Sequence, residues 1–95
     1  MKKPKAITSL TKTVEYMVSQ DYIKRFEAEY YQTQIRFNSL YIMIDKFHAG
    51  ALDFEPVTPM DVLILQLKAM DSYLRVLEAR AKIEGIELDT KRYNI

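Results

Sequence analysis

Glycine and proline interrupt this chain at only five positions, and their placement restricts what it can fold into. They stand at Pro4, Gly50, Pro56, Pro59 and Gly85 of a 95-residue sequence. Two long stretches between them contain neither residue. Since glycine and proline are the residues that most often interrupt helices and strands, each stretch can form one long continuous element. The kind of element follows from the spacing of its apolar residues.

The first stretch has helical periodicity in two phases. One apolar stripe consists of Ile7, Leu10, Val14 and Met17, in steps of 3 and 4. The register then reaches Asp21, and a second stripe restarts at Phe26 and continues through Tyr30, Thr33, Phe37, Leu40, Ile44 and Phe47, like a coiled-coil seam. The change of phase predicts a short helix over 9–20 and a long helix over 22–48, with Asp21 as N-cap. A single bent helix is the alternative.

The second stretch carries start and stop signals for another long helix. Thr58 suits the N-cap, Pro59 the first helical position, and Asp61 complements the helix dipole. Gly85 stands where a helix-ending glycine belongs. The apolar stripe between these signals is Leu63, Leu67, Met70, Leu74, Leu77 and Ala81. We therefore expect a helix over about 59–84.

The two long helices have matched lengths, which favours a hairpin. A helix of about 26 residues is about 40 Å long, and both predicted helices have this length. The connector over 49–57 can return the chain antiparallel to itself. If the turn centres near Asp53, Arg36 lies near Asp71 and Arg80 near Glu27. The predicted fold class is all-α: a long antiparallel helical hairpin with a short N-terminal helix.

The chain length allows one domain. We expect residues 1–8 to form a flexible basic N-terminal arm, residues 9–88 a single helical domain, and residues 89–95 a C-terminal tail. The apolar residues near the end are Ile86, Leu88, Tyr93 and Ile95, so the tail either packs back on the hairpin or swaps to a neighbour.

Composition excludes several classes of protein. With no cysteine, one histidine and two glycines, there is no disulfide framework, no thiolate or His-rich metal site and no Gly-rich phosphate loop. A net charge of +1 argues against a dedicated nucleic-acid binder. The longest uncharged apolar run is 62–65, far below the roughly 20 residues of a membrane span. We expect no metal, no cofactor and no membrane partner.

Residues for catalysis are also missing. His48 falls at a predicted helix end, where the dipole favours a cation. Glu27 and Glu29 lie on different sides of their helix, and there is no paired carboxylate–histidine motif. We expect no catalytic residues and no enzymatic activity.

The hairpin has more apolar surface than one seam can bury. Exposed apolar patches of this kind normally mark an interface, so we expect a homo-oligomer assembled as a helical bundle. A compact three-helix monomer is the alternative. The residues predicted to form the oligomer interface are Val62, Leu65, Ala69, Val76, Ile35 and Ile42.

Aromatic and basic residues offer two possible ligand sites. Aromatic rings with nearby arginines can stack a base and meet phosphate, and the candidate residues are Tyr31, Arg36, Tyr73, Arg75 and Arg80. Core packing with hydroxyls at the rim is the simpler interpretation of the tyrosines. The basic N-terminus, with Lys2, Lys3, Lys5 and Lys12, could contact nucleic acid, although such an arm is more often only solvated.

Residues 24–88 resemble a family of small helical proteins of tailed phages and prophages, related to a crAss-like phage protein. The likeness is carried by the run 52–56 and by Gln66, Met70, Tyr73 and Arg80 in the last helix. The resemblance implies a non-enzymatic phage accessory protein in the host cytoplasm. It would engage or sequester a host protein or other host factor, for instance to counter a defence system. An oligomeric sponge for cyclic-nucleotide signals and a nucleic-acid accessory factor are the alternatives.

Overall fold

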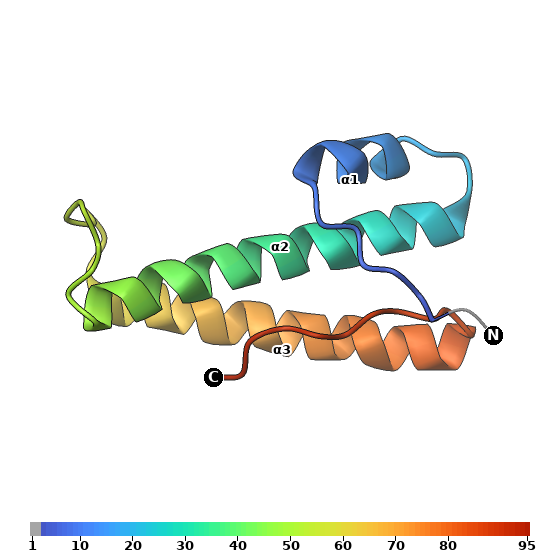
Figure 1. Ribbon diagram of the computed structural model, residues 1–95. Helices are drawn as coiled ribbons and strands as arrows, with labels where there is room; N and C mark the ends of the chain where they lie inside the picture. The colour runs from blue at the N-terminus through green and yellow to red at the C-terminus, as the bar shows by residue number, and fades with distance from the viewer. Residues whose placement is uncertain (1–2) are drawn as a thin grey trace.

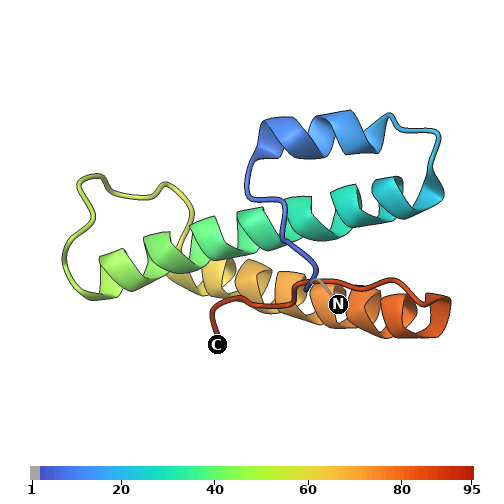
Figure 2. The same cartoon turned by 45° about the vertical axis from the view of Figure 1, so that its right-hand side comes forward.

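The structure, a computed structural model, describes residues 3–95, and this part of the chain folds into three helices without a strand. They are α1 (Leu10–Met17), α2 (Tyr22–His48) and α3 (Met60–Glu84). α2 and α3 form an antiparallel hairpin, and α1 lies along the first half of α2 on the side away from α3 (Figures 1 and 2). The molecule measures 42 × 25 × 23 Å. The predicted all-α architecture is confirmed.

The predicted break at Asp21 separates two helices. Its side chain accepts a hydrogen bond from the backbone N–H of Ile23 at 2.9 Å and so caps α2. The alternative of a single bent helix is therefore wrong. α1 is shorter than predicted, because it ends at Met17 rather than near residue 20.

The start of α3 differs by one residue from the prediction. Pro59 takes the N-cap position in an extended conformation, and its carbonyl accepts hydrogen bonds from the N–H groups of Val62 and Leu63. Thr58 is therefore not the cap. At the other end Gly85 has φ +73°, which L side chains rarely adopt, and Ile86 N–H bonds back to Ala81. The predicted glycine stop is confirmed.

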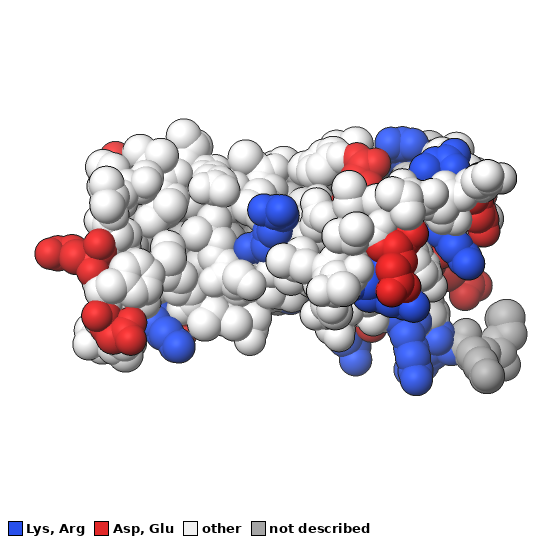
Figure 3. Space-filling view, turned by 90° about the horizontal axis from the view of Figure 1, so that it is seen from above, with Lys and Arg blue, Asp and Glu red and all other residues white. Residues whose placement is uncertain are grey.

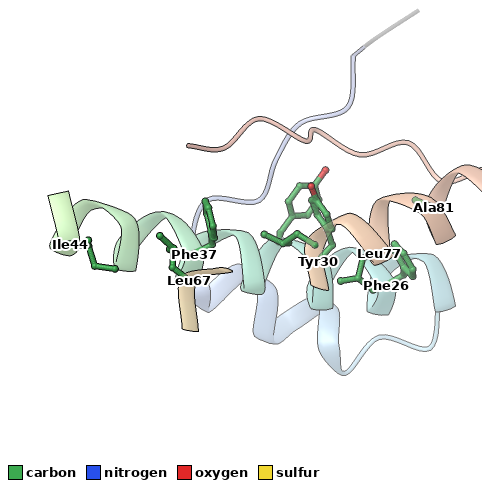
Figure 4. Close-up of a cluster of buried hydrophobic side chains, with 9 residues drawn as sticks. Phe26, Tyr30, Phe37, Ile44, Leu67, Leu77 and Ala81 are labelled. Carbon is green, nitrogen blue, oxygen red and sulfur yellow. The ribbon is translucent and has the colours of Figure 1, made fainter. Parts of the chain in front are cut away.

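The core lies between α2 and α3. Its side chains point toward one another from the two helices, as Figure 4 shows. The buried members are Phe26, Tyr30, Tyr31, Phe37, Ile44, Leu67, Leu74, Leu77 and Ala81. With the exception of Tyr31, these belong to the two predicted stripes, so the 3–4 spacing correctly identifies the facing sides of the hairpin.

The predicted register of the hairpin is confirmed, but its two predicted ion pairs do not form. Tyr22 donates to Glu84 at 2.5 Å across the hairpin. Asp71, however, pairs with Arg75 one turn away on α3 rather than with Arg36, and Arg80 likewise pairs with Glu84 rather than with Glu27. Partners at i and i+4 on one helix are already close, so they reach these charges first.

α1 packs on α2 through a polar residue. Thr13 is fully buried, and its hydroxyl donates to the carbonyl of Leu10 and lies 3.4 Å from the Gln32 amide. The apolar stripe of α1 is only half covered, with Leu10, Val14 and Met17 about half exposed. The short helix therefore leaves apolar surface in solvent.

The C-terminal segment packs back along the hairpin (Figures 1 and 2). Gln34 is buried on α2, and its amide donates to the carbonyls of Asp89 and Lys91 at 2.9 and 3.0 Å. The Tyr31 hydroxyl accepts from Asp89 N–H, and Tyr93 stacks on Tyr41 with ring centroids 4.6 Å apart. Of the two expected arrangements of the tail, this chain adopts the folded-back one.

Candidate functional site

A groove of about 870 Å³ lies where both ends of the chain meet the second half of α3. Its apolar lining consists of Ala79 and Ala81 of α3 and of Ile86 and Leu88 of the tail. The remaining lining residues are polar or lie at the N-terminal end: Lys3, Pro4, Arg75, Glu78, Lys82, Glu87 and Thr90. Three segments distant in sequence therefore build one site.

Local structure explains why the groove forms there. The left-handed conformation of Gly85 ends α3 and reverses the chain, so residues 86–90 run back beside the helix they have just left. The N-terminal segment crosses α2 and reaches the same place, with Ala6 and Ile7 packed against the core (Figure 1).

Arg92 anchors the tail to α3 through two carboxylates, one of which, Glu78, lines the groove. It is 8% exposed and its guanidinium donates to Asp71 at 3.1 Å and, by another nitrogen, to Glu78. Burial alone would raise the pKa of Asp71, but hydrogen bonds from Arg75 and Arg92 hold that pKa below its ordinary value. Burial and the bond to Glu78 raise the pKa of Tyr30, so its hydroxyl remains a donor.

These bonds decide which charges of the groove are available to a ligand. The Glu78 carboxylate accepts from Tyr30 and Arg92, and Asp71 accepts from Arg75 through Nε only. No ion pair within residues 3–95 engages Lys3 or Lys82. The groove thus offers apolar side chains, ammonium groups and the outer guanidinium nitrogens of Arg75 beside the carboxylate of Glu87. This excess of cations next to an apolar lining suits a small anion with an apolar ring system.

The five predicted ligand-binding residues do not converge. Tyr31 is fully buried, edge-to-face with Tyr30, so neither face of its ring is open to a base. Arg36 is exposed on α2, and Tyr73 is 42% exposed on α3. Of the set, Arg75 alone lines the groove.

Arg80 belongs to a separate cluster at the open end of the hairpin. Its guanidinium lies over the Phe26 ring and donates to the Tyr22 hydroxyl at 3.0 Å, and Nε is 3.4 Å from Glu84. The hydrogen bond to Glu84 is the main reason that the pKa of Tyr22 is raised. This cluster ties α2 to α3, so these contacts account for Arg80 without a role in ligand binding.

Lys3 is predicted only as part of the basic N-terminal arm, and Lys82 is not among the predicted site residues, although both line the groove. A signal for Lys82 was present, because Lys68, Arg75 and Lys82 recur every seven residues and so share one edge of α3. Nothing local marks Lys3 or the buried Arg92, whose positions depend on where the two ends of the chain return.

The residues predicted for the oligomer interface remain accessible. Val62, Leu65, Ala69 and Val76 are exposed on α3, while on α2 Ile42 is exposed and Ile35 is half-buried. The single chain therefore leaves most of this predicted surface uncovered.

The predicted contact of the basic N-terminal region with nucleic acid has little support in the geometry. Lys12 of the basic N-terminal region bonds to Glu15 at 3.1 Å, and Lys2 lies outside the described residues. Acidic and basic side chains are intermixed on the face seen in Figure 3, without a broad basic patch there. Residues 3–95 contain no cluster that could hold a metal ion and no helix able to span a membrane.

The hairpin is the part of the chain that a known family covers. The family model described as Sequestin matches residues 20–83, about two thirds of the sequence. The chain belongs to the Sequestin family. The match begins just before α2 and ends in the last turn of α3, so the Sequestin segment contains the α3 wall of the groove but neither α1 nor the tail.

The Sequestin match overlaps the region of resemblance seen in the sequence, and the family name is consistent with a sequestering, binding role. Among curated proteins and solved structures, none matches the chain.

Proposed function

We propose that this chain is a non-enzymatic binding protein that sequesters a small anionic host molecule of the nucleotide class during phage infection. The observation that carries the proposal is the groove beside α3, where apolar side chains lie next to Lys3 and Lys82, whose ammonium groups form no ion pair within residues 3–95. Membership of the Sequestin family supports the sequestering role.

A sequestering protein lowers the concentration of its free ligand in proportion to the number of its binding sites. Phosphate oxygens of the ligand would meet Lys3, Lys82 and the free nitrogens of Arg75, while its base lies against Ile86 and Leu88. Each bound molecule is withdrawn from the free pool without being changed. If the ligand is a cyclic nucleotide that signals infection, its withdrawal blunts a host defence, which is the phage role that the sequence resemblance implies.

The test is a thermal-shift series with a panel of cyclic mononucleotides and dinucleotides. A ligand at 100 times its Kd stabilises the folded state by about 2.7 kcal/mol, which corresponds to a Tm increase of about 14 °C in a chain of this size. Chromatography of the ligand after denaturing the complex should recover it intact.

Charge reversal in the groove supplies the matched control. The double variant Arg75→Glu/Lys82→Glu should lose the ligand-induced shift, whereas Lys46→Glu, an exposed site at the far end of α2, should keep it. No shift with any nucleotide, or equal shifts in both variants, would contradict this function.

Capture of a host protein is the second candidate, favoured by the half-exposed stripe of α1. Leu10, Val14 and Met17 present one apolar edge to solvent, away from the groove. If this stripe binds a protein, Leu10→Glu/Met17→Glu should abolish recovery of one defined host protein and leave the nucleotide shift unchanged.

A further inference from the structure

α3 has a second apolar seam, opposite the one that forms the core. Its members follow steps of 3, 4, 3, 4, 3 and 4, which is the heptad spacing of a coiled-coil contact. All seven are uncharged and exposed: Val62, Leu65, Ala69, Ser72, Val76, Ala79 and Ile83. The largest of them are open to solvent, with Leu65 67% and Ile83 85% exposed. We call this set the outer seam.

The accessible surface of the chain is larger than the average for a compact monomer of its mass. It amounts to 6888 Å². A folded monomer of 11.2 kDa is expected to expose about 5,700 Å², so the surplus is about 1,200 Å². A stable interface of standard size buries about 800 Å² on each partner. The surplus is therefore enough for one full interface per chain.

We propose that two copies of this chain pair through the outer seam, antiparallel about Ser72, and that the pairing completes the ligand groove. A second copy fits the seam because the seam complements itself in this orientation. Near each end Leu65 of one copy packs between Val76 and Ile83 of the other. Between these two bulky clusters, Ala69 and Ser72 are small enough to let the helix backbones approach closely.

Charges beside the seam favour the antiparallel orientation. In antiparallel coiled coils the same flanking edge of each helix meets its copy, so Asp61 faces Lys82 of the partner subunit in two symmetrical pairs. Both orientations also bring like charges together, Lys68 with Arg75 in the antiparallel pair and Arg75 with Arg80 in a parallel one, but the parallel pair forms no opposite-charge pair along that edge.

The outer seam and the groove share a border. Ala79 belongs to the seam and also lines the groove, and Arg75 and Lys82 stand on the edge between them. In the antiparallel pair Lys68 of the partner subunit lies beside Arg75. Two like charges then meet at the groove rim and an anion can bridge them. Each groove thus gains the cation of Lys68 from the other copy, while Lys82 lies between the ligand and Asp61 of the partner subunit. This last step rests on the proposed function.

Cysteine cross-linking tests the pairing directly, because the chain has no cysteine of its own. Ser72→Cys lies near the proposed twofold axis and should form an intermolecular disulfide in mild oxidant. Ile83→Cys should not, since the two copies of residue 83 would be about 33 Å apart along the helices. A mixture of Val62→Cys and Ile83→Cys chains should cross-link again, because these positions meet across the pair.

A disulfide in the Ile83→Cys chain alone would overturn the antiparallel orientation. A chain that stays monomeric at every concentration in light scattering would overturn the pairing and leave the outer seam to a different partner. Leu65→Glu/Val76→Glu should abolish the dimer, whereas Val57→Glu, fully exposed in the connector, should leave it intact.

Lys68→Glu separates the pairing from the ligand function. Because it removes a like-charge contact with Arg75, this variant should retain the dimer and bind the nucleotide at least tenfold more weakly. Cross-linking as predicted together with an absent nucleotide shift would leave the pairing standing and contradict the proposed function alone. An intact dimer whose nucleotide affinity is unchanged by Lys68→Glu would overturn the shared groove.

Discussion

Among single residues, Arg92 contributes most to holding the tail in place. It is a nearly buried cation with two carboxylate partners, and its guanidinium also lies over the Phe37 ring at 5.8 Å. The polar partners of the tail are likewise buried, since Gln34 is 4% exposed and bonds to two tail carbonyls. A tail that merely rested on the surface would not need such contacts.

Replacing Arg92 by methionine should destabilise the fold by about 3 kcal/mol. The substitution keeps the length of the side chain but leaves Asp71 and Glu78 without their buried partner, which is the costly way to break such a pair. Urea denaturation would measure the loss. Arg36→Met, at an exposed position, should change stability by less than about 0.5 kcal/mol, and equal losses in the two variants would contradict this role.

Asp71 should make the stability of the fold depend on acid pH. Its pKa is lowered in the folded state, so the unfolded chain binds its proton first as the pH falls. The stabilisation is therefore complete above the unfolded pKa of about 3.9 and is lost as the pH drops through the folded value. Denaturation midpoints at several pH values below 5 should show a shallower loss for Asp71→Asn than for the parent chain. An equal loss of stability with falling pH in the two chains would contradict this role of Asp71.

At the scale of the elements, the two long helices are the part that sequence predicts best. Their apolar stripes repeat over many turns, and Asp21 and Gly85 mark two ends by backbone chemistry that acts locally. α1 is different because it has only eight residues, too few for its stripe to decide which side is buried. Its orientation follows instead from tertiary packing, which buries Thr13 and places its hydroxyl beside Gln32 of α2.

The cap at Asp21 should contribute about 1 kcal/mol. Asp21→Ala removes the acceptor for Ile23 N–H at the junction between α1 and α2, and an orphan donor at a helix start costs about this much. Thermal unfolding would measure the change, with Asp53→Ala in the exposed connector as control. A Tm unchanged by Asp21→Ala would show that the junction is held by packing alone.

For the whole molecule, periodicity predicts the hairpin but not the groove. The groove is assembled from the N-terminal segment, α3 and the tail, and no local pattern relates Lys3 to Leu88. The position of Tyr31 likewise depends on the returning tail, because Tyr31 is fully buried and its hydroxyl accepts a hydrogen bond from Asp89 N–H. The surplus apolar surface, by contrast, follows directly from the composition of α3 and is present in the structure.

The central claim is that a paired, unreactive assembly holds a small anion in a site beside α3. Native mass spectrometry of the purified protein, mixed with the cyclic nucleotide that gives the largest thermal shift, tests it most directly. We expect a species of twice 11.2 kDa carrying unmodified nucleotide, with the bound mass lost in Arg75→Glu/Lys82→Glu. A species at the mass of one chain, without bound nucleotide at any concentration, would contradict it.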